Sequence, residues 1–251
     1  MHRFFAPSLD PGDETAILPR EEGEHLTRVL RLTAGDTVAV FDGRGHEFLA
    51  RVIGSVVDAE RRRAISVQLL SRIEPAAEPA VALTLVQAVL KADKMDDIVR
   101  DAVMLGAAAI HPIITNRTEV TVAAVMRGAR LDRWRRVALA SVKQSRRATL
   151  PEIRMPLGFE DFLDEPPTAL RLMLVEPSAS ADVESIGALR DHPIPGDAAV
   201  LVGPEGGWTQ EECAMARARG VRLICLGHRT LRADAAPIAA ISVLQFLWND
   251  L

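Results

Sequence analysis

The sequence predicts a mixed α/β protein in which a small β-rich domain precedes a larger domain built on a parallel sheet. Three observations indicate this fold class. The chain has 251 residues, of which 48% are hydrophobic and 25% charged, which is enough for a buried core in each of two domains. Residues 1–72 contain short alternating runs between turn residues. Residues 78–251 instead alternate apolar runs with helical patterns.

The first predicted domain, residues 1–72, consists of strands that turn residues separate. Its clearest strands cover residues 37–42, 47–57 and 64–70. The Asp42-Gly43 pair is typical of a hairpin turn between the first two strands. The polar run 58–63 predicts a turn between the last two. We expect a compact barrel or sandwich.

A short helix is predicted before these strands and a linker after them. The helix carries Leu26, Val29 and Leu30 on its buried face and ends at Gly35. The linker covers residues 73–79, because two prolines and several small residues disfavour regular structure there.

The second predicted domain, residues 78–251, has the pattern of a parallel sheet. The expected strands are 81–89, 108–114, 169–177, 198–202 and 221–227, and the expected helices are 95–106, 129–147, 209–219 and 236–248. Strands that are apolar along their whole length are typical of a parallel sheet with helices on both faces. Ligands of such sheets bind at the carboxyl ends of the strands.

Charge is unevenly distributed along the chain. The formal net charge of −4 disfavours a nucleic-acid partner when taken alone. Residues 91–154, however, hold thirteen basic and seven acidic residues, and residues 127–147 are rich in arginine. This run either contacts RNA phosphates or is a solvated helix face.

Cysteine usage and hydropathy restrict the class of protein further. Cys213 and Cys225 have neither a CxxC spacing nor histidines at metal-site intervals, so the sequence predicts no metal site and no redox pair. No apolar run approaches the length of a membrane span. A cytoplasmic protein that does not bind a membrane is therefore expected.

The expected site lies where three strands end in unusual residues. These ends are 175–177, 203–207 and 226–232. Glycines at 203, 206 and 207 allow close approach of a ligand and positive φ, and Thr209 followed by Glu211 and Glu212 predicts a helix start. Because no GK[ST] follows, a phosphate loop is poorly supported, and a tight β–α turn without a ligand remains the alternative.

Several motifs in order make this chain resemble the SPOUT methyltransferases, and within them the ribosomal RNA small subunit methyltransferase E family. The motifs are MHRFF at the start, HLTRVLRLTAGDTVAVFDGRG at 25–45, KADKMDDIVRDAVMLGA at 91–107, RWRRVALASVKQSRRATLPEI at 133–153, LVGPEGGWTQEE and LGHRTLRADAAPIAAISVLQ. The resemblance implies methylation of N3 of a uridine in 16S rRNA, numbered 1498 in the usual scheme, with S-adenosylmethionine as cofactor. It also implies a PUA-like RNA-binding barrel and a trefoil-knotted α/β domain, with the knot and cofactor site near 170–251. A homodimer is expected.

Carried over by motif, the resemblance implies a set of site residues. The expected cofactor-binding residues are Leu174, Val175, Glu176, Gly203, Pro204, Glu205, Gly206, Leu226, Gly227 and Leu231. Uracil N3 must lose a proton, so a base or a stabiliser of the anion is needed. Arg232 is expected to stabilise the anion or grip a phosphate, with Asp234 or Glu205 orienting it, and Asp234 is also a candidate base. The alternative is a plain Arg232–Asp234 ion pair at a helix start.

Arginines dominate the expected RNA contacts, since a guanidinium binds phosphate in a bidentate manner. The expected residues are Arg28, Arg31, Arg117, Arg133, Arg136, Gln144 and Arg147. The family commonly reads LRTETA where this chain reads LRADAA at 231–236, so two hydroxyls are lost. Two alternatives stay open: methylation of another RNA position by the same fold and, because of this change, a non-catalytic RNA-binding assembly factor.

Overall fold

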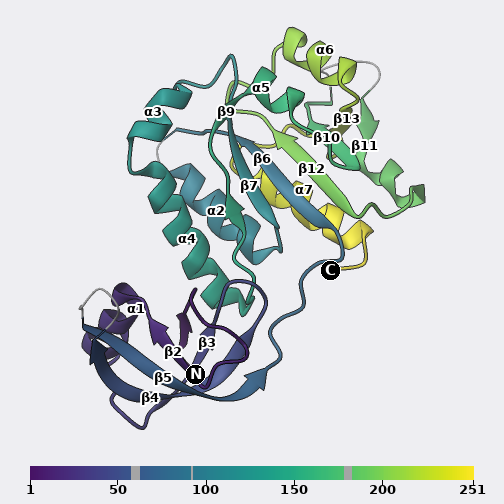
Figure 1. Ribbon diagram of the computed structural model, residues 1–251. Coiled ribbons are helices and arrows are strands. Elements are labelled where there is room, and N and C mark those ends of the chain that lie inside the picture. The colour runs from purple at the N-terminus through teal and green to yellow at the C-terminus, as the bar shows by residue number, and fades with distance from the viewer. Residues whose placement is uncertain (58–62, 92, 178–182) are drawn as a thin grey trace. The chain divides into compact units, whose positions relative to one another are not determined.

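The computed structural model describes residues 1–57, 63–91, 93–177 and 183–251, which form two compact units (Figure 1). Unit 1 comprises Met1–Glu78 and Val142–Leu150, and unit 2 comprises Pro79–Ser141 and Pro151–Leu251. The turn expected at 58–63 lies outside the described residues except for residue 63. Nothing in the sequence pattern indicated that 142–150 would join the first unit.

The sheet of unit 1 has five strands among the described residues, in the order β1-β3-β4-β5-β2. They are β1 (Arg3–Phe5), β2 (Thr15–Leu18), β3 (Thr37–Phe41), β4 (Glu47–Val57) and β5 (Arg63–Ile73). β1 pairs in parallel with β3, and the other neighbours are antiparallel. Alternate side chains from these strands enclose one core, which includes Phe4, Leu18, Val38, Val40 and Val67. The three expected strands are confirmed.

The hairpin expected at Asp42-Gly43 connects β3 and β4. Gly43 and Gly45 take positive φ values of 78° and 100°, which an L side chain would disfavour. The buried Asp42 carboxylate accepts hydrogen bonds from the backbone N–H groups of Arg44 and His46, at 2.7 and 3.1 Å. A carboxylate that folds back on its own turn is the reason this pair begins a loop.

The helix expected before β3 is shorter than its sequence pattern suggested. It consists of α1 (Arg20–Glu24) followed by a π-helical turn, η1 (His25–Val29). Leu26 is buried as expected, but the prediction for Val29 is wrong, since this side chain is 65% exposed. The wider π turn rotates Val29 out of register with Leu26. The backbone then leaves the helix at Arg31, whose φ is 56°, four residues before the predicted end at Gly35.

Hydrogen bonds from Arg3 hold the segment 142–150 within unit 1. Arg3 forms a bidentate pair with Glu47 and also donates to the backbone carbonyls of Val142, Lys143 and Arg147. Carbonyls at the end of a helix lack intrahelical partners, so a cation there is favourable. The segment is therefore anchored by polar contacts, in addition to its buried apolar side chains Val142 and Ala148.

Further ion pairs involve the side chains of the segment itself. The Lys143 ammonium pairs with Glu22, and the Arg147 guanidinium pairs with Glu78. Arg147 is 4% exposed, so both its charge and its hydrogen bonds are used inside the unit.

The sheet of unit 2 is parallel throughout, as expected. Over the described residues its eight strands run in the order β11-β13-β10-β12-β6-β7-β8, with β9 also on β7. They are β6 (Ala82–Ala88), β7 (Ala109–Ile114), β8 (Glu152–Ile153), β9 (Leu157–Gly158), β10 (Leu170–Leu174), β11 (Glu184–Ser185), β12 (Asp197–Val202) and β13 (Arg222–Cys225). The five strands expected here are confirmed, and the two-residue strands are too short for a sequence pattern.

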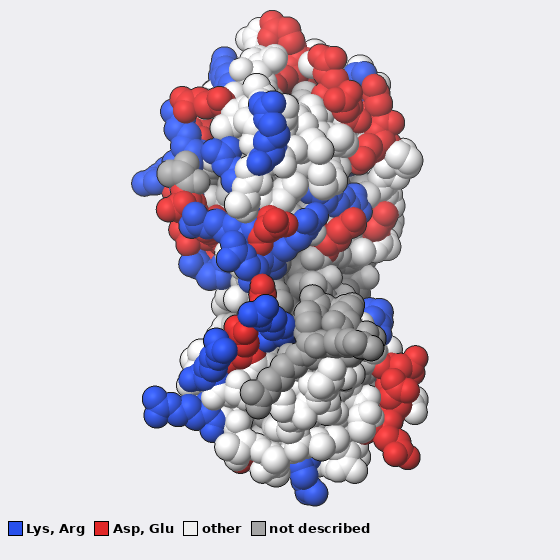
Figure 2. Space-filling model, turned by 60° about the vertical axis from the view of Figure 1, so that its left-hand side comes forward, with Lys and Arg blue, Asp and Glu red and all other residues white. Residues whose placement is uncertain are grey.

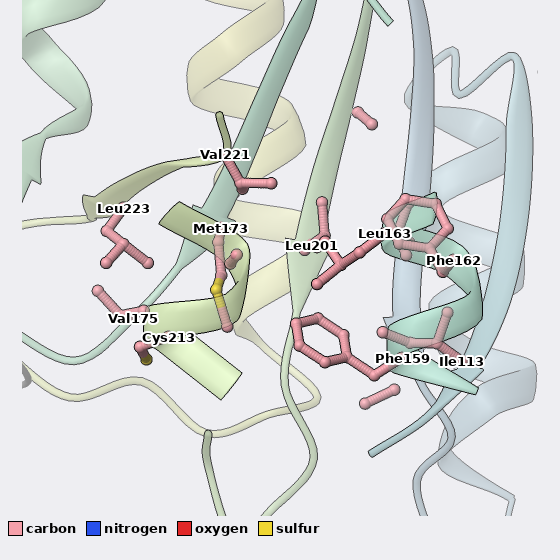
Figure 3. Packing of buried hydrophobic residues seen from close by; sticks show 14 residues of the cluster. Ile113, Phe159, Phe162, Leu163, Met173, Val175, Leu201, Cys213, Val221 and Leu223 are labelled. Atoms are coloured by element: carbon pink, nitrogen blue, oxygen red, sulfur yellow. The ribbon is translucent and has the colours of Figure 1, made fainter. Parts of the chain in front are cut away.

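Helices cover both faces of this sheet. They are α2 (Lys94–Met104), α3 (Val122–Arg127), α4 (Arg130–Ser145), α5 (Phe159–Asp164), the short η2 (Ile186–Asp191), α6 (Gln210–Ala218) and α7 (Ala236–Leu247). On one face, Met173 and Leu201 pack with Phe159 and Phe162 of α5 and with Cys213 of α6 (Figure 3). α7 passes behind β12 on the opposite face (Figure 1). No helix in the described part of the chain is both long and apolar enough to span a bilayer.

Candidate active site

A cavity of about 590 Å³ opens at the carboxyl ends of β10, β12 and β13. Its volume lies in the range of sites for small organic ligands. Most residues that the motifs indicated for cofactor binding line it: Leu174, Val175, Glu176, Gly203, Pro204, Glu205, Gly206, Leu226 and Leu231. Among the described residues Gly227 is the exception, and it forms the turn after Leu226 with φ of 109°. The topology therefore brings three distant sequence motifs to one edge of the sheet.

The glycines after β12 serve different purposes. Gly207 takes a positive φ of 68°, which confirms the backbone role expected for this loop. A Cβ at Gly203 would lie 3.0 Å from the Trp208 indole, and one at Gly206 would lie 3.1 Å from the Arg117 side chain. Both positions are therefore small because a protein side chain packs against them, and not only to admit a ligand.

Trp208 ties the glycine loop to the neighbouring strand. Its indole N–H donates to the Leu174 carbonyl at 2.9 Å, at the last residue of β10. Its ring also contacts Phe159, with centroids 5.2 Å apart. A large side chain with one polar edge fixes both strand ends relative to each other.

Lys94 holds the Glu205 carboxylate. The ammonium lies 2.8 Å from Glu205 Oε1, and the backbone N–H of Lys91 donates to the same oxygen at 3.3 Å. Partial burial alone would raise the pKa of Glu205, but these hydrogen bonds and the Lys94 charge bring that pKa below its ordinary value. Glu205 is thus an anion at neutral pH.

Arg232 and Asp234 form a bidentate ion pair beside the cavity. Arg232 Nε and Nη2 donate to the two carboxylate oxygens at 3.1 and 2.7 Å. The Arg232 side chain is 77% exposed, whereas that of Asp234 is 28% exposed. Partial burial would raise the pKa of Asp234, but its hydrogen bond with Arg232 and the guanidinium charge lower it. No side chain caps α7, whose N-cap residue is Ala235, so Asp234 does not act as a helix cap.

The helix expected after the glycine loop begins with a complete capping box. Thr209 Oγ1 accepts from the Glu212 N–H at 3.1 Å, and the Glu212 carboxylate accepts from the Thr209 N–H at 2.8 Å. This reciprocal pair confirms the helix start at Thr209.

The residues expected to contact RNA lie in different surroundings. Arg28, Arg31, Arg136 and Gln144 are exposed. Arg133 is half-exposed and pairs with Asp93 and Asp96, and basic and acidic side chains are interspersed on the face in Figure 2.

Arg117 and Arg147 differ from the expectation of a free surface cation. Arg117 lines the cavity and donates to the Gly206 carbonyl at 2.6 Å. Arg147 is buried against Glu78, so in this structure its guanidinium is not available to a phosphate. The reason is that 142–150 folds onto unit 1, which helical periodicity does not reveal.

Sequence reasoning missed several cavity residues, including Lys94, Trp208, Arg229 and Thr230. All four lie inside the family motifs at 91–107, 201–212 and 226–245, so their place in the chain was a usable signal. Lys94 is the first residue of α2, the helix that follows β6, and only the strand order β10-β12-β6 places the start of that helix beside Glu205. The part of the chain that the structure describes contains no cluster of three or more metal-binding side chains.

Two protein-family models match the chain. An RNA methyltransferase domain covers residues 77–245, and an RNA methyltransferase PUA domain covers residues 18–55. A ribosomal RNA small subunit methyltransferase E from Synechocystis sp. is 33% identical over 238 residues, which is 94% of this chain and 74% of the relative. The chain belongs to the ribosomal RNA small subunit methyltransferase E family.

Solved structures related to this family agree with the assignment. The methyltransferase E structure from Neisseria gonorrhoeae, bound to S-adenosylmethionine, has a TM-score of 0.84 and 32% identity and covers 99% of this chain and 98% of its own. A protein from Legionella pneumophila, solved with the cofactor SAM, also has a TM-score of 0.84, with 30% identity over 97% of this chain and 96% of its own. The small β-rich unit followed by a parallel α/β unit is thus the fold of the family. The knot implied by the resemblance stays a prediction.

Proposed function

We propose that this protein methylates N3 of a uridine in 16S rRNA, with S-adenosylmethionine as methyl donor. The observation that carries the proposal is the cavity at the carboxyl ends of β10, β12 and β13, which the family motifs line. Membership of the ribosomal RNA small subunit methyltransferase E family supports the choice of substrate, and two relatives with this fold have S-adenosylmethionine bound. The cytoplasm, where small ribosomal subunits reside, is the proposed location.

The lining of the cavity suits this cofactor. Leu174, Val202 and Leu226 provide apolar walls for a flat, neutral adenine, and backbone groups of the adjacent loops are available to orient it. The lining also carries Glu176, whose carboxylate complements a sulfonium, whereas the Glu205 carboxylate is paired with Lys94. When bound, the cofactor supplies a methyl group that leaves its sulfur as the bond to uracil N3 forms.

The charged pair at the cavity defines what the chain itself contributes to the reaction. Arg232 faces solvent at the cavity and is held by Asp234, so its guanidinium is oriented before RNA arrives. We assign Arg232 to stabilise the negative charge that develops on uracil as N3 loses its proton to solvent water. Asp234 is a weak base because its pKa is lowered, so its role is to orient Arg232. Glu205, held by Lys94, does not contact Arg232 in this arrangement and instead shapes the glycine loop.

The RNA and subunit partners follow from the same proposal. The exposed arginines Arg28, Arg31, Arg133 and Arg136, together with the neutral amide of Gln144, are proposed to contact rRNA in the small ribosomal subunit. We also propose a homodimer, because the family resemblance implies one; Phe246 on α7 is 61% exposed and would be covered by an interface on this helix. Light scattering of the purified protein tests the dimer.

Two measurements test the proposed function. Calorimetry with S-adenosylmethionine should show binding at one site per chain, and its absence would favour a non-catalytic RNA-binding factor. Small subunits from a strain that lacks the corresponding methyltransferase should gain one methyl group on a 16S rRNA uridine base, located by mass spectrometry. A methyl group on ribose, or on another RNA, would reject the proposal.

The role of Arg232 has its own test. Arg232→Ala should lower turnover at least a hundredfold, in the range known for loss of one transition-state contact, while S-adenosylmethionine affinity changes less than threefold. Arg219→Ala, at the end of α6, is the matched control and should keep full turnover. Equal losses of turnover and cofactor affinity in Arg232→Ala would indicate a structural ion pair instead.

A further inference from the structure

A buried carboxylate connects the loop after β7 with the start of α6. Glu212 is 1% exposed, and its two oxygens accept different backbone donors. Oε1 accepts from the N–H of Asn116 and Oε2 from the N–H of Thr209, both at 2.8 Å. Because these residues are far apart in the sequence, Glu212 acts as a bridge and not only as a helix cap.

The loop that Glu212 holds carries Arg117, which in turn holds the glycine loop. Arg117 Nη1 donates to the Gly206 carbonyl at 2.6 Å. The aliphatic part of Arg117 lies over Gly206, where an added Cβ would be 3.1 Å from Arg117 Cβ and 3.2 Å from its Cδ. Arg117 is exposed on its outer side, so its position depends on the backbone that presents it.

We propose that Glu212 is a positioning residue for the cofactor site, acting through Asn116 and Arg117 on Gly206. The inference rests on the proposed function, since it concerns the same cavity. An ionised carboxylate is the side chain that can accept from both backbone N–H groups at once. A glutamine would place an NH₂ group against one of them, and an aspartate is one methylene shorter.

The arrangement explains how a flexible glycine loop keeps one shape. Gly206 and Gly207 have little conformational preference of their own, so the loop conformation must be imposed from outside. Glu205 is held by Lys94, Gly206 by Arg117, and Gly203 packs against Trp208. The contact from Arg117 is supported by the buried Glu212 side chain, which bonds the backbone of the adjacent Asn116. A loop that is ordered in advance loses less binding free energy when the ligand binds.

The test compares four variants in binding of S-adenosylmethionine by calorimetry, without RNA. Glu212→Gln and Arg117→Ala should each weaken binding by about tenfold, the loss expected for one charge-assisted hydrogen bond. The double variant should bind as weakly as Arg117→Ala alone, because both changes break the same connection. Glu160→Gln, which changes an exposed carboxylate on α5 that does not line the cavity, is the control and should bind like the wild type.

Independent effects of the Glu212 and Arg117 substitutions on cofactor affinity would overturn the proposal. If Glu212→Gln costs the same factor in the Arg117→Ala background as in the wild type, Glu212 does not act through Arg117. Wild-type affinity in Arg117→Ala would refute it as well, even if Glu212→Gln does not fold. Failure of the wild type to bind the cofactor would instead contradict the proposed function.

Amide hydrogen exchange separates positioning from loss of helix stability, and it needs no ligand. Glu212→Gln should speed exchange at least tenfold in the 203–207 loop, where the Gly207 N–H donates to the Pro204 carbonyl. Thr209→Val removes the hydroxyl cap of α6 but keeps both bonds of the carboxylate, so exchange in this loop should stay within twofold of the wild type. Unchanged exchange in Glu212→Gln, or equal acceleration in both variants, would reject the positioning role.

Discussion

Trp208 offers the most informative single perturbation, because one indole edge holds two strand ends. Trp208→Phe keeps an aromatic ring but removes the N–H that donates to the Leu174 carbonyl at 2.9 Å. Leaving a half-buried carbonyl without this donor should cost about 1–3 kcal/mol. At roughly 2–4 °C per kcal/mol for a chain of this length, the Tm should fall by about 2–12 °C.

A substitution at Gly203 allows the contact with Trp208 to be measured by a double-mutant cycle. A Cβ at position 203 would lie 3.0 Å from Trp208 Cε2 and Nε1, which are atoms of the five-membered ring that phenylalanine lacks. Gly203→Ala in the wild type should therefore destabilise by about 1–3 kcal/mol through overpacking. In the Trp208→Phe background the same change should cost less than about 0.5 kcal/mol.

The assay is thermal unfolding of the four proteins of this cycle, together with calorimetry of S-adenosylmethionine. Trp208→Phe should weaken cofactor binding, since Leu174 and Gly203 both line the cavity. Trp248→Phe, a buried tryptophan at the end of α7, is the control for loss of indole volume and should leave the affinity unchanged. Additive effects of Trp208→Phe and Gly203→Ala, or an unchanged affinity in Trp208→Phe, would refute the reasoning.

The remaining predictions concern charged and titratable groups. Burial lowers the pKa of His111 below 6.5, so the unfolded chain binds the proton more tightly and the free energy of unfolding decreases as pH falls below about 6.5. His111→Phe should abolish this decrease, as measured by urea unfolding between pH 7.5 and 5. An unchanged pH dependence in the variant would contradict the prediction. Lys94→Met should raise the pKa of Glu205 toward its ordinary value, as carboxyl NMR titration would show, whereas an unmoved pKa would mean that the backbone bond from Lys91 suffices. Arg147→Met should destabilise the protein by about 1–3 kcal/mol in urea unfolding, because it leaves Glu78 without its partner. The dependence of rRNA affinity on salt concentration should not change; a weaker dependence would show that this arginine contacts phosphate.

Short-range patterns accounted for most elements of the fold. Apolar runs with helices between them predicted the strands of unit 2, because a doubly covered parallel sheet leaves no polar face to interrupt them. The Asp42-Gly43 turn and the helix start at Thr209 were predictable because each is made by hydrogen bonds between residues only a few positions apart. The prediction that Val29 is buried was wrong because a π-helical turn changes the helical period on which it depended.

The parallel α/β fold class, the three motifs of the cavity and, through the order of those motifs, the family can all be inferred from the amino-acid sequence. The folded chain is needed to see which polar groups meet: Lys94 with Glu205, Arg147 with Glu78, and the Glu212 carboxylate with the backbone N–H of Asn116. The physical reason lies in range. Backbone propensity and periodicity act over a few residues, whereas these contacts depend on the path of the whole chain, which brings residues about seventy to over one hundred positions apart within hydrogen-bond distance.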